Sequence, residues 1–263
     1  MSQSTSRPLK LEGKVAIVTG GASGIGESTV RLFADNGVKV VVIADIQDDR
    51  GRQVAESIGS QRCSYIRCDV TDENQVQSMV ESTVKKYGKL DVMFSNAGVL
   101  SSQDQTILDL DLSASDKLFE VNVKGMAACV KHAARAMVEG GVRGSIVCTG
   151  SVVAANGSRR RTDYCMSKHA VLGLVRSASV QLGGKGIRVN CVSPSGVATA
   201  ATCRSLGMGM EDVEKAYRGM SRLEGVALKA SHVADAVLFL ASDDSAFVTG
   251  HDLVVDGSFV PVL

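Results

Sequence analysis

Short apolar runs alternate with stretches of helical periodicity along almost the whole chain. The apolar runs have the length of strands, and they lie at residues 15–18, 38–45, 63–70, 90–95, 144–149, 186–192 and 253–255. Helical patterns separate them, at residues 24–33, 48–57, 73–87, 113–139, 162–182 and 231–241. Thr71 and Ser231 are the expected N-caps of two of these helices.

Strands separated by helices predict a parallel sheet with right-handed crossovers. The chain contains only three prolines and no low-complexity linker. We therefore expect a single α/β domain over residues 11–263, doubly wound, with a mainly parallel sheet of about seven strands flanked by helices. Residues 1–10 are expected to form a flexible N-terminus.

A glycine-rich turn, TGGASGIG from Thr19 to Gly26, connects the first apolar run to the first helical stretch. Glycines let the backbone approach a pyrophosphate, and the N-terminus of the following helix directs free N–H groups at the anion. Such a turn is weak evidence alone, but the flanking strand and helix make it specific for a Rossmann-type dinucleotide site. The expected contacts are Gly20, Ser23, Gly24, Ile25 and Gly26.

An acidic residue, Asp45, ends the second apolar run about 20 residues after the turn. A carboxylate at this strand tip accepts hydrogen bonds from the adenosine ribose and repels a 2′-phosphate. No Arg or Lys follows it until Arg50. The sequence therefore predicts NAD rather than NADP as the cofactor. The alternative role for Asp45 is a helix cap or turn residue.

Composition excludes several other classes. The net charge is +1 and the one basic cluster is Arg159-Arg160-Arg161, so nucleic acid is not an expected partner. We see no apolar run of signal-peptide length at the start, and no run of the roughly 18 apolar residues that a membrane span needs. The seven cysteines include no Cys-x-x-Cys pair, and the four histidines have no metal spacing. We expect a reducing, cytoplasmic setting and no metal.

Further motifs complete a resemblance to the short-chain dehydrogenase/reductase family, in its NAD-dependent form, that covers the chain from Leu11 to Gly257. The motifs are Thr19-Gly20-x-x-x-Gly24-x-Gly26, Asp69-Val70, Asn96-Ala97-Gly98, Asn122, Ser151, Tyr164-x-x-x-Lys168 and Asn190-x-Val192-x-Pro194. Longer phrases such as LDVMFSNAGV and IRVNCVSPSGVAT resemble the plant branch with borneol, isopiperitenol and secoisolariciresinol dehydrogenases and nepetalactol-related enzymes.

The candidate catalytic residues are Asn122, Ser151, Tyr164 and Lys168. Tyr164 and Lys168 lie four residues apart on an expected helix, hence on one face. A free Tyr has a pKa near 10 and is a poor base at neutral pH, but a nearby ammonium lowers that pKa. Tyr164 can then take a proton from an alcohol as hydride leaves. In isolation, such a pair is more often a surface pair.

The resemblance implies roles for the other two residues. Ser151 would face Tyr164 and hydrogen-bond the reacting oxygen; its alternative is a strand-end turn. Asn122, in the middle of a helical pattern, would hold a water that links Lys168 to solvent. A cap or kink is the alternative for an Asn at this place, because its side chain competes for backbone hydrogen bonds.

The same resemblance implies further cofactor contacts. Asp69 would accept from the adenine amino group, with Val70 beside it, and Lys168 would bond the nicotinamide ribose, where Tyr164 also lies. The remaining expected contacts are Asn96, Ala97, Gly98, Val197 and Thr199. Each of these positions is alternatively a strand-end turn or a cap.

The expected substrate side is apolar, with no Arg or Lys clearly directed at it. Its candidates are Val99, Leu100, Val152, Val153, Leu206, Met208 and Met210. The alternating glycines and methionines at 207–210 suggest a substrate lid at about residues 199–226, or alternatively a small packed helix.

Three local features near the family motifs bear on the shape of the site. Gly150 is expected to leave room near the reacting carbon. Ser195 stands where the family usually has Gly, which would reshape the nicotinamide pocket or the lid hinge. Arg159, Arg160 and Arg161 are expected to face solvent, with a subunit edge or an anionic ligand as alternatives.

These features predict NAD-dependent oxidation of a small apolar secondary alcohol, a cyclic monoterpenol such as borneol, to the ketone. An NAD-bound, non-redox monoterpenoid cyclase of the nepetalactol type is the retained alternative. The intact catalytic set argues against a silent binding protein. We also expect a homotetramer, because the helices at 113–139 and 162–182 carry more apolar residues than one packed side needs. Those residues include Val130, Met137, Val171, Leu174 and Val175.

Overall fold

The computed structural model describes residues 9–101 and 103–258, so residues 1–8 of the expected flexible N-terminus lie outside the described part. In that part, seven strands form one sheet in the order β3-β2-β1-β4-β5-β6-β7, and every pairing is parallel. The strands are β1 (Val15–Thr19), β2 (Val40–Asp45), β3 (Cys63–Arg67), β4 (Val92–Ser95), β5 (Ser145–Thr149), β6 (Arg188–Pro194) and β7 (Asp252–Val255). The expected single doubly wound α/β domain is confirmed.

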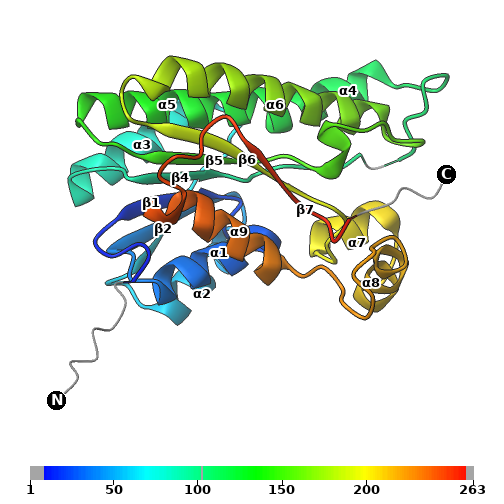
Figure 1. Cartoon of the computed structure of the whole chain (residues 1–263), viewed down its shortest axis with the longest axis horizontal. Helices are drawn as coiled ribbons and strands as arrows, with labels where there is room; N and C mark the ends of the chain where they lie inside the picture. Colours follow the sequence, from blue (N-terminus) through cyan, green and yellow to red (C-terminus); the bar gives the residue numbers. More distant parts are fainter. Residues whose placement is uncertain (1–8, 102, 259–263) are drawn as a thin grey trace.

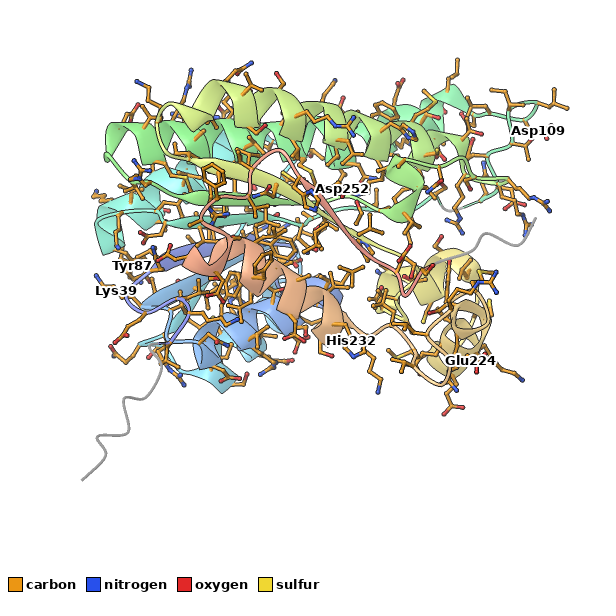
Figure 2. All side chains as sticks on the ribbon, viewed as in Figure 1. Lys39, Tyr87, Asp109, Glu224, His232 and Asp252 are labelled. Atoms are coloured by element: carbon orange, nitrogen blue, oxygen red, sulfur yellow. The ribbon has the colours of Figure 1, made fainter. Side chains whose placement is uncertain are left out.

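Helices cover both faces of the sheet (Figure 1). One face carries α1 (Gly24–Asp35), α2 (Asp48–Ile58) and α9 (Ala230–Ala241). The other carries α3 (Glu73–Tyr87), α4 (Leu112–Phe119), α5 (Met126–Glu139) and α6 (Thr162–Gly183). Two short helices, α7 (Ala200–Leu206) and α8 (Met210–Arg218), follow β6 and form a small lobe beside the sheet. Figure 2 shows Glu224 in this lobe, and His232 near the start of α9.

Strands that are apolar on both sides produce two cores, because successive residues of a strand point to opposite faces. In β1 all five residues are buried. Ile17 packs into the core under α3, α5 and α6, whereas its neighbours Ala16 and Val18 pack into the core against α1 and α9. The continuous apolar runs in the sequence thus reflect burial from both faces.

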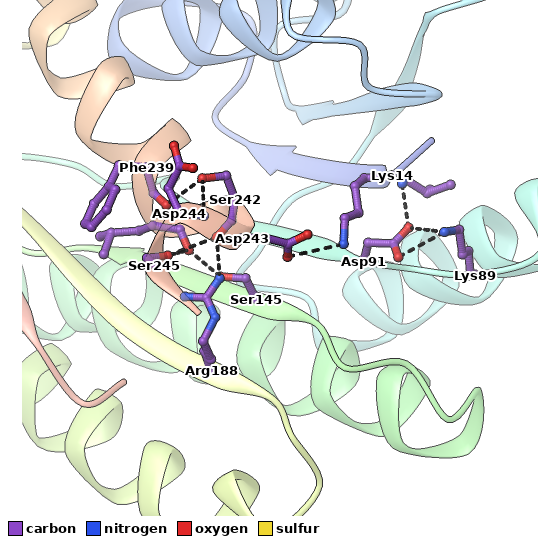
Figure 3. A network of polar contacts seen from close by, with 12 residues as sticks. Lys14, Lys89, Asp91, Ser145, Arg188, Phe239, Ser242, Asp243, Asp244 and Ser245 are labelled. Carbon is purple, nitrogen blue, oxygen red and sulfur yellow. Dashed lines mark hydrogen bonds and ion pairs between the residues drawn. The ribbon is translucent and has the colours of Figure 1, made fainter. Parts of the chain in front are cut away.

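The amino edge of the sheet is fastened by polar side chains (Figure 3). Asp91 accepts a hydrogen bond from the N–H of Val15 at 2.7 Å and pairs with Lys89 at 3.1 Å. At the other side of this network, Arg188 donates to the carbonyl of Ser242 at 3.0 Å. Ligands of open α/β sheets bind at the carboxyl ends of the strands, so this network serves folding and leaves the opposite edge for the site.

Two predicted helix caps were wrong. The N-cap of α3 is Asp72 rather than Thr71: its carboxylate accepts from the N–H groups of Asn74 and Gln75, which a charged acceptor at a helix N-terminus does well. Helix α9 begins at Ala230, so that Ser231 lies inside it and Lys229 is the N-cap.

The apolar residues that suggested a tetramer are largely used within the chain itself. Val130, Met137, Val171 and Val175 are buried in the core beneath α5 and α6, and Leu174 packs against that core. These residues are therefore not left over for contacts between subunits, and the argument for a tetramer from their number was wrong. In the described part, no helix is long and apolar enough to cross a membrane.

Candidate functional site

The glycine-rich turn lies at the carboxyl end of β1, where the order of strands reverses between β1 and β4. Gly20 and Gly24 have positive φ angles of 65° and 57°, which L residues with side chains rarely adopt. A Cβ on Gly26 would collide with the carbonyl oxygen of Gly20, and one on Gly20 would lie 3.0 Å from the Cα of Ala97. The glycines therefore allow α1 and the β4 loop to approach the turn closely.

Asp45, at the tip of β2, is 5% exposed and holds this turn in place. One carboxylate oxygen accepts from the N–H of Ala22 at 3.0 Å, and the other accepts from the N–H of Gln47 at 3.0 Å. The alternative role as a turn residue is thus present in the structure. Asp45 also lines the cavity described below.

Hydrogen bonds fasten the carboxyl ends of β1, β4 and β5 to one another. The N–H groups of Asn96 and Ala97 both donate to the hydroxyl of Thr19, at 2.9 and 3.1 Å. The side chain of Asn96 donates to the carbonyl of Thr19 and accepts from the hydroxyl of Thr149. Asn96 therefore builds the floor of the site between the strand ends.

The long helical pattern at 113–139 is interrupted by a π-helical turn, Glu120–Gly125. Asn122 in this turn is fully buried. Its side-chain oxygen accepts from the N–H of Val99 at 2.8 Å, and its amide donates to the carbonyl of Val99 at 2.9 Å and to the hydroxyl of Ser167 at 3.3 Å. Such π-helical turns frequently occur at functional sites. Here the turn fixes the segment that follows β4.

The three remaining candidate catalytic residues come together beside β5. Ser151 follows that strand, while Tyr164 and Lys168 lie one turn apart on α6. The Lys168 ammonium is 5.6 Å from the centre of the Tyr164 ring. It is 3% exposed and donates to the carbonyl of Thr149 at 2.8 Å. The surface-pair alternative is therefore wrong for Lys168.

Burial dominates the protonation of this group. It raises the pKa of Tyr164 to about 12, with hydrogen bonding to Ser151 acting in the opposite direction. It lowers the pKa of Lys168 from 10.5 to about 8. We expected the lysine to lower the tyrosine pKa, but desolvation of the phenolate outweighs neighbouring charges here. The phenol is thus held protonated at neutral pH, and the lysine carries a weakly held proton.

A cavity of about 920 Å³ lies over the carboxyl ends of the strands, which is within the size range of ligand sites. It is lined by every predicted site residue except Gly26 and Asn122, which support it from behind. The predicted residues on its wall are Gly20, Ser23, Gly24, Ile25, Asp45, Asp69, Val70, Asn96, Ala97, Gly98, Ser151, Tyr164, Lys168, Val197 and Thr199.

The predicted apolar end of the cavity is partly correct. Val99, Leu100, Val152, Val153 and Leu206 line it. Two other predicted wall residues, Met208 and Met210, do not line it and are 37% and 58% exposed, because Gly207 ends α7 and turns the chain outward.

Other residues near this end differ from what the sequence suggested. No pattern in the sequence indicates Tyr217 and Met220, which reach the cavity from α8 and the turn after it. Gly150 leaves no spare room, since a Cβ there would lie 2.5 Å from the Ser193 hydroxyl. Ser195, in place of the usual Gly, also lines the cavity.

Arginines at the cavity wall contradict the expectation that no cation approaches it. Arg159, Arg160, Arg161 and Arg204 all line the cavity. Arg160 forms an ion pair with Asp104, and Arg161 is half-buried. The expectation that all three residues of the cluster simply face solvent is therefore wrong for Arg161.

The residues present fit a dinucleotide with a nicotinamide. The turn offers a backbone cradle that any Cβ on Gly26 would fill, and a buried carboxylate stands at the tip of β2. A tyrosine, a serine and a lysine stand at the far end of the same cavity. Among the described residues, no group of three or more His, Cys, Asp or Glu side chains is placed to hold a metal ion.

Comparison with known proteins agrees with this geometry. A family model described as "Enoyl-(Acyl carrier protein) reductase" matches residues 20–259. A solved short-chain type dehydrogenase/reductase from Mycobacterium marinum superposes with a TM-score of 0.87 at 32% identity, covering 97% of this chain and 98% of that one. The chain belongs to the short-chain dehydrogenase/reductase family, whose fold and site imply a nicotinamide cofactor.

Two plant relatives are more similar in sequence. A (+)-cis,trans-nepetalactol synthase of Nepeta racemosa is 60% identical over 254 residues, which cover 95% of this chain and 94% of the relative. A (−)-isopiperitenol/(−)-carveol dehydrogenase of Mentha piperita, described as mitochondrial, is 59% identical and covers 94% of each chain. The narrower resemblance to plant terpenoid enzymes is thus confirmed.

Proposed function

We propose that this protein oxidises a secondary alcohol of a small apolar molecule, a cyclic monoterpenol such as borneol, to the ketone with NAD as the hydride acceptor. The observation that carries the proposal is the position of Ser151, Tyr164 and Lys168 in one cavity with an apolar wall. The similarity to a monoterpenol dehydrogenase supports the substrate class.

Each side chain has a distinct task in this reaction. The cofactor supplies an electrophilic nicotinamide carbon that accepts hydride. In its phenolate form, Tyr164 would receive the proton of the alcohol on its oxygen and become the neutral phenol. Ser151 donates to the same substrate oxygen and thereby fixes its direction. Lys168 would bind the hydroxyls of the nicotinamide ribose and, being positively charged below about pH 8, favours the phenolate of Tyr164 as it forms.

The remaining predicted contacts hold the cofactor along the sheet edge. We assign the pyrophosphate to the turn at Gly20 and Gly24, and the adenosine ribose to Asp45. Asp45 supports NAD over NADP because a buried carboxylate repels a 2′-phosphate. We assign Asp69 and Val70 to the adenine, and Val197 and Thr199 to the nicotinamide. All four line the cavity, and Thr199 also caps α7.

A second function has its own support. The 60% identity to a nepetalactol synthase favours a non-redox cyclase, in which NAD is bound and Tyr164 or Ser151 directs only proton movement. The two functions differ in whether the reduced cofactor accumulates. A reactive enol or dialdehyde would be cyclised by the second without any NADH.

The test is the absorbance of NADH when the purified protein, NAD and a panel of cyclic monoterpenols are mixed. We expect NADH with at least one alcohol and none with a sugar alcohol. Tyr164→Phe should lower turnover by roughly 10²-fold or more. The matched control is Tyr87→Phe, which removes a hydroxyl that binds Ser64 at the remote end of α3 (Figure 2). No NADH with any alcohol, together with cyclisation of a dialdehyde, would establish the alternative.

We further propose a homotetramer in the cytoplasm. The family resemblance supports the tetramer, in which α5 and α6 would pair with their copies; Val138, Met166 and Val180 are exposed apolar residues on these helices. The seven free cysteines support a reducing compartment. Light scattering at micromolar concentration tests the assembly, and a stable 27.5 kDa monomer would contradict it.

A further inference from the structure

We propose that Arg161 is a positioning residue that anchors the lid helix α7 over the substrate end of the cavity, through Ser205 and Ser101. The proposal rests on the proposed function, because it assigns a role in closing that same site. Its observation is separate: one guanidinium joins the start of the catalytic helix, the loop after β4 and α7.

The contacts of this lid anchor are short. The Nη1 of Arg161 donates to the hydroxyl of Ser205 at 2.7 Å and to the carbonyl of Ser101 at 3.1 Å. Ser205 in turn donates to the same carbonyl of Ser101 at 2.8 Å. Three groups from residues far apart in the sequence thus meet at one carbonyl oxygen. Hydrogen bonds from a charged donor are stronger than neutral ones, so the guanidinium dominates this cluster.

Helix α7 has little else to hold it. None of the residues Ala200–Leu206 is buried, so apolar burial contributes little to its position. A helix of this length is not stable by itself in water. Thr199 caps its start, at 3.3 Å from the N–H of Thr202. Its other end is held through Ser205, which accepts from Arg161 and donates to Ser101.

The anchored end of α7 is the part that faces the substrate. Arg204 and Leu206 flank Ser205, and both line the cavity. Fixing Ser205 therefore fixes Leu206 in the wall of the cavity that Val99 and Leu100 also line. Without the anchor, water enters beside the reacting oxygen and the apolar wall loses its shape.

The anchor also reaches the catalytic helix. The hydroxyl of Ser101 donates to Asp163 at 2.7 Å, and the same carboxylate oxygen accepts from the N–H of Tyr164 at 2.7 Å. Ser101 and Asp163 are 5% and 1% exposed. Closure of α7 is thus tied, through Ser101, to the first turn of α6, which carries Tyr164.

Hydrogen exchange of the NAD-bound protein, followed by mass spectrometry of peptides covering residues 200–206, measures the anchor without any turnover. Arg161→Met and Ser205→Ala should each raise exchange there by about tenfold, the effect of losing one hydrogen bond to a charged group. Arg161→Lys, which keeps a cationic donor, should lie between Arg161→Met and the native protein. The double variant should exchange no faster than the faster single variant, because both changes break the shared contact between Arg161 and Ser205.

Arg160→Met is the matched control for exchange in α7, since it removes the neighbouring arginine and its ion pair with Asp104 but no contact to α7. Unchanged exchange in α7 for Arg161→Met, an equal rise for Arg160→Met, or additive single effects would each overturn the proposal. Should Arg161→Met not fold, Arg161→Lys decides the question, and unchanged exchange in α7 for that variant would overturn the proposal.

Kinetics with an active alcohol add a second readout. Arg161→Met should raise KM for the alcohol on the order of tenfold and change kcat less. Arg161→Lys should raise KM by a smaller factor. A fall in kcat alone would contradict a role in holding the substrate. If no alcohol is oxidised by the native protein, the proposed function fails, while the exchange measurement still judges the anchor.

Discussion

The side-chain amide of Asn122 pairs with both backbone groups of Val99, accepting from its N–H at 2.8 Å and donating to its carbonyl at 2.9 Å. The pair joins the π-helical turn to the loop after β4. Because Val99 lines the cavity, this pairing sets one wall of the substrate space.

Asn122→Asp keeps the size of the side chain but places a carboxylate oxygen against the carbonyl of Val99. The hydrogen bonds that the amide donates to Val99 and Ser167 are lost, and the new carboxylate oxygen faces the carbonyl of Val99, so the free energy of unfolding should fall by about 1–3 kcal/mol. Turnover should fall as well, because the wall at Val99 shifts. Urea unfolding of both proteins checks the first expectation, and an unchanged midpoint would contradict it.

Burial of the charged Lys168 ammonium destabilises the folded protein. Its pKa is lowered to about 8 in the folded protein from 10.5, so the penalty is complete below pH 8 and disappears as pH rises toward 10.5. Lys168→Met should therefore be inactive yet more stable at pH 7, by up to about 3 kcal/mol. This gain should shrink at pH 9.5. Lys185→Met, at an exposed position, is the control, and a gain independent of pH would refute the explanation.

The raised pKa of Tyr164 predicts the direction of the pH profile. As pH rises toward about 12, more phenolate is present to accept the proton of the alcohol. Oxidation, measured as kcat/KM, should therefore increase from about pH 6 to about pH 7.5, below the pKa of Lys168, where its ammonium is retained. The reverse reduction uses the protonated phenol and should not increase. An oxidation rate that falls over this range would contradict the role of Tyr164 as proton acceptor.

Cofactor choice depends on Asp45. NAD should bind at least about tenfold more tightly than NADP, because the carboxylate repels a 2′-phosphate. Asp45→Ala combined with Ile46→Arg should narrow this gap. Asp45→Asn removes the charge and keeps an acceptor for the N–H of Ala22, at the loss of the acceptor for the N–H of Gln47. Equal affinity of the native protein for both cofactors, in calorimetric titrations, would contradict the assignment.

Much of the fold could be predicted because its strands are buried on both faces and its helices are periodic. The predicted range of α3 coincides with the observed Glu73–Tyr87, and the site residues at strand ends meet in one cavity. The π-helical turn at Glu120–Gly125 has no periodic signature. A Cβ on Gly125 would lie 2.9 Å from the carbonyl of Val70, a close approach that only the tertiary structure reveals.

The sequence does not reveal which residues of the lid and of the arginine cluster face the cavity, because tertiary contacts decide this. Met208 and Met210 follow the helix-ending Gly207, whose φ of 63° turns them away from the cavity, while Tyr217 returns to it and packs on Gly196. The direction of Arg161 depends on Ser101 and Ser205, which are distant in sequence. Such contacts depend on how helices and loops pack against one another, and not on the residue pattern within a single helix or strand.

The central claim is hydride transfer from an alcohol carbon to NAD with Tyr164 as proton acceptor. The most direct measurement uses a cyclic monoterpenol carrying deuterium on its carbinol carbon, with the reduced cofactor analysed by mass spectrometry. Our account predicts deuterium in the NADH, formed with the native protein and at least about 10²-fold more slowly with Tyr164→Phe. Formation of product without deuterium in the cofactor, or equal rates for the two proteins, would contradict it.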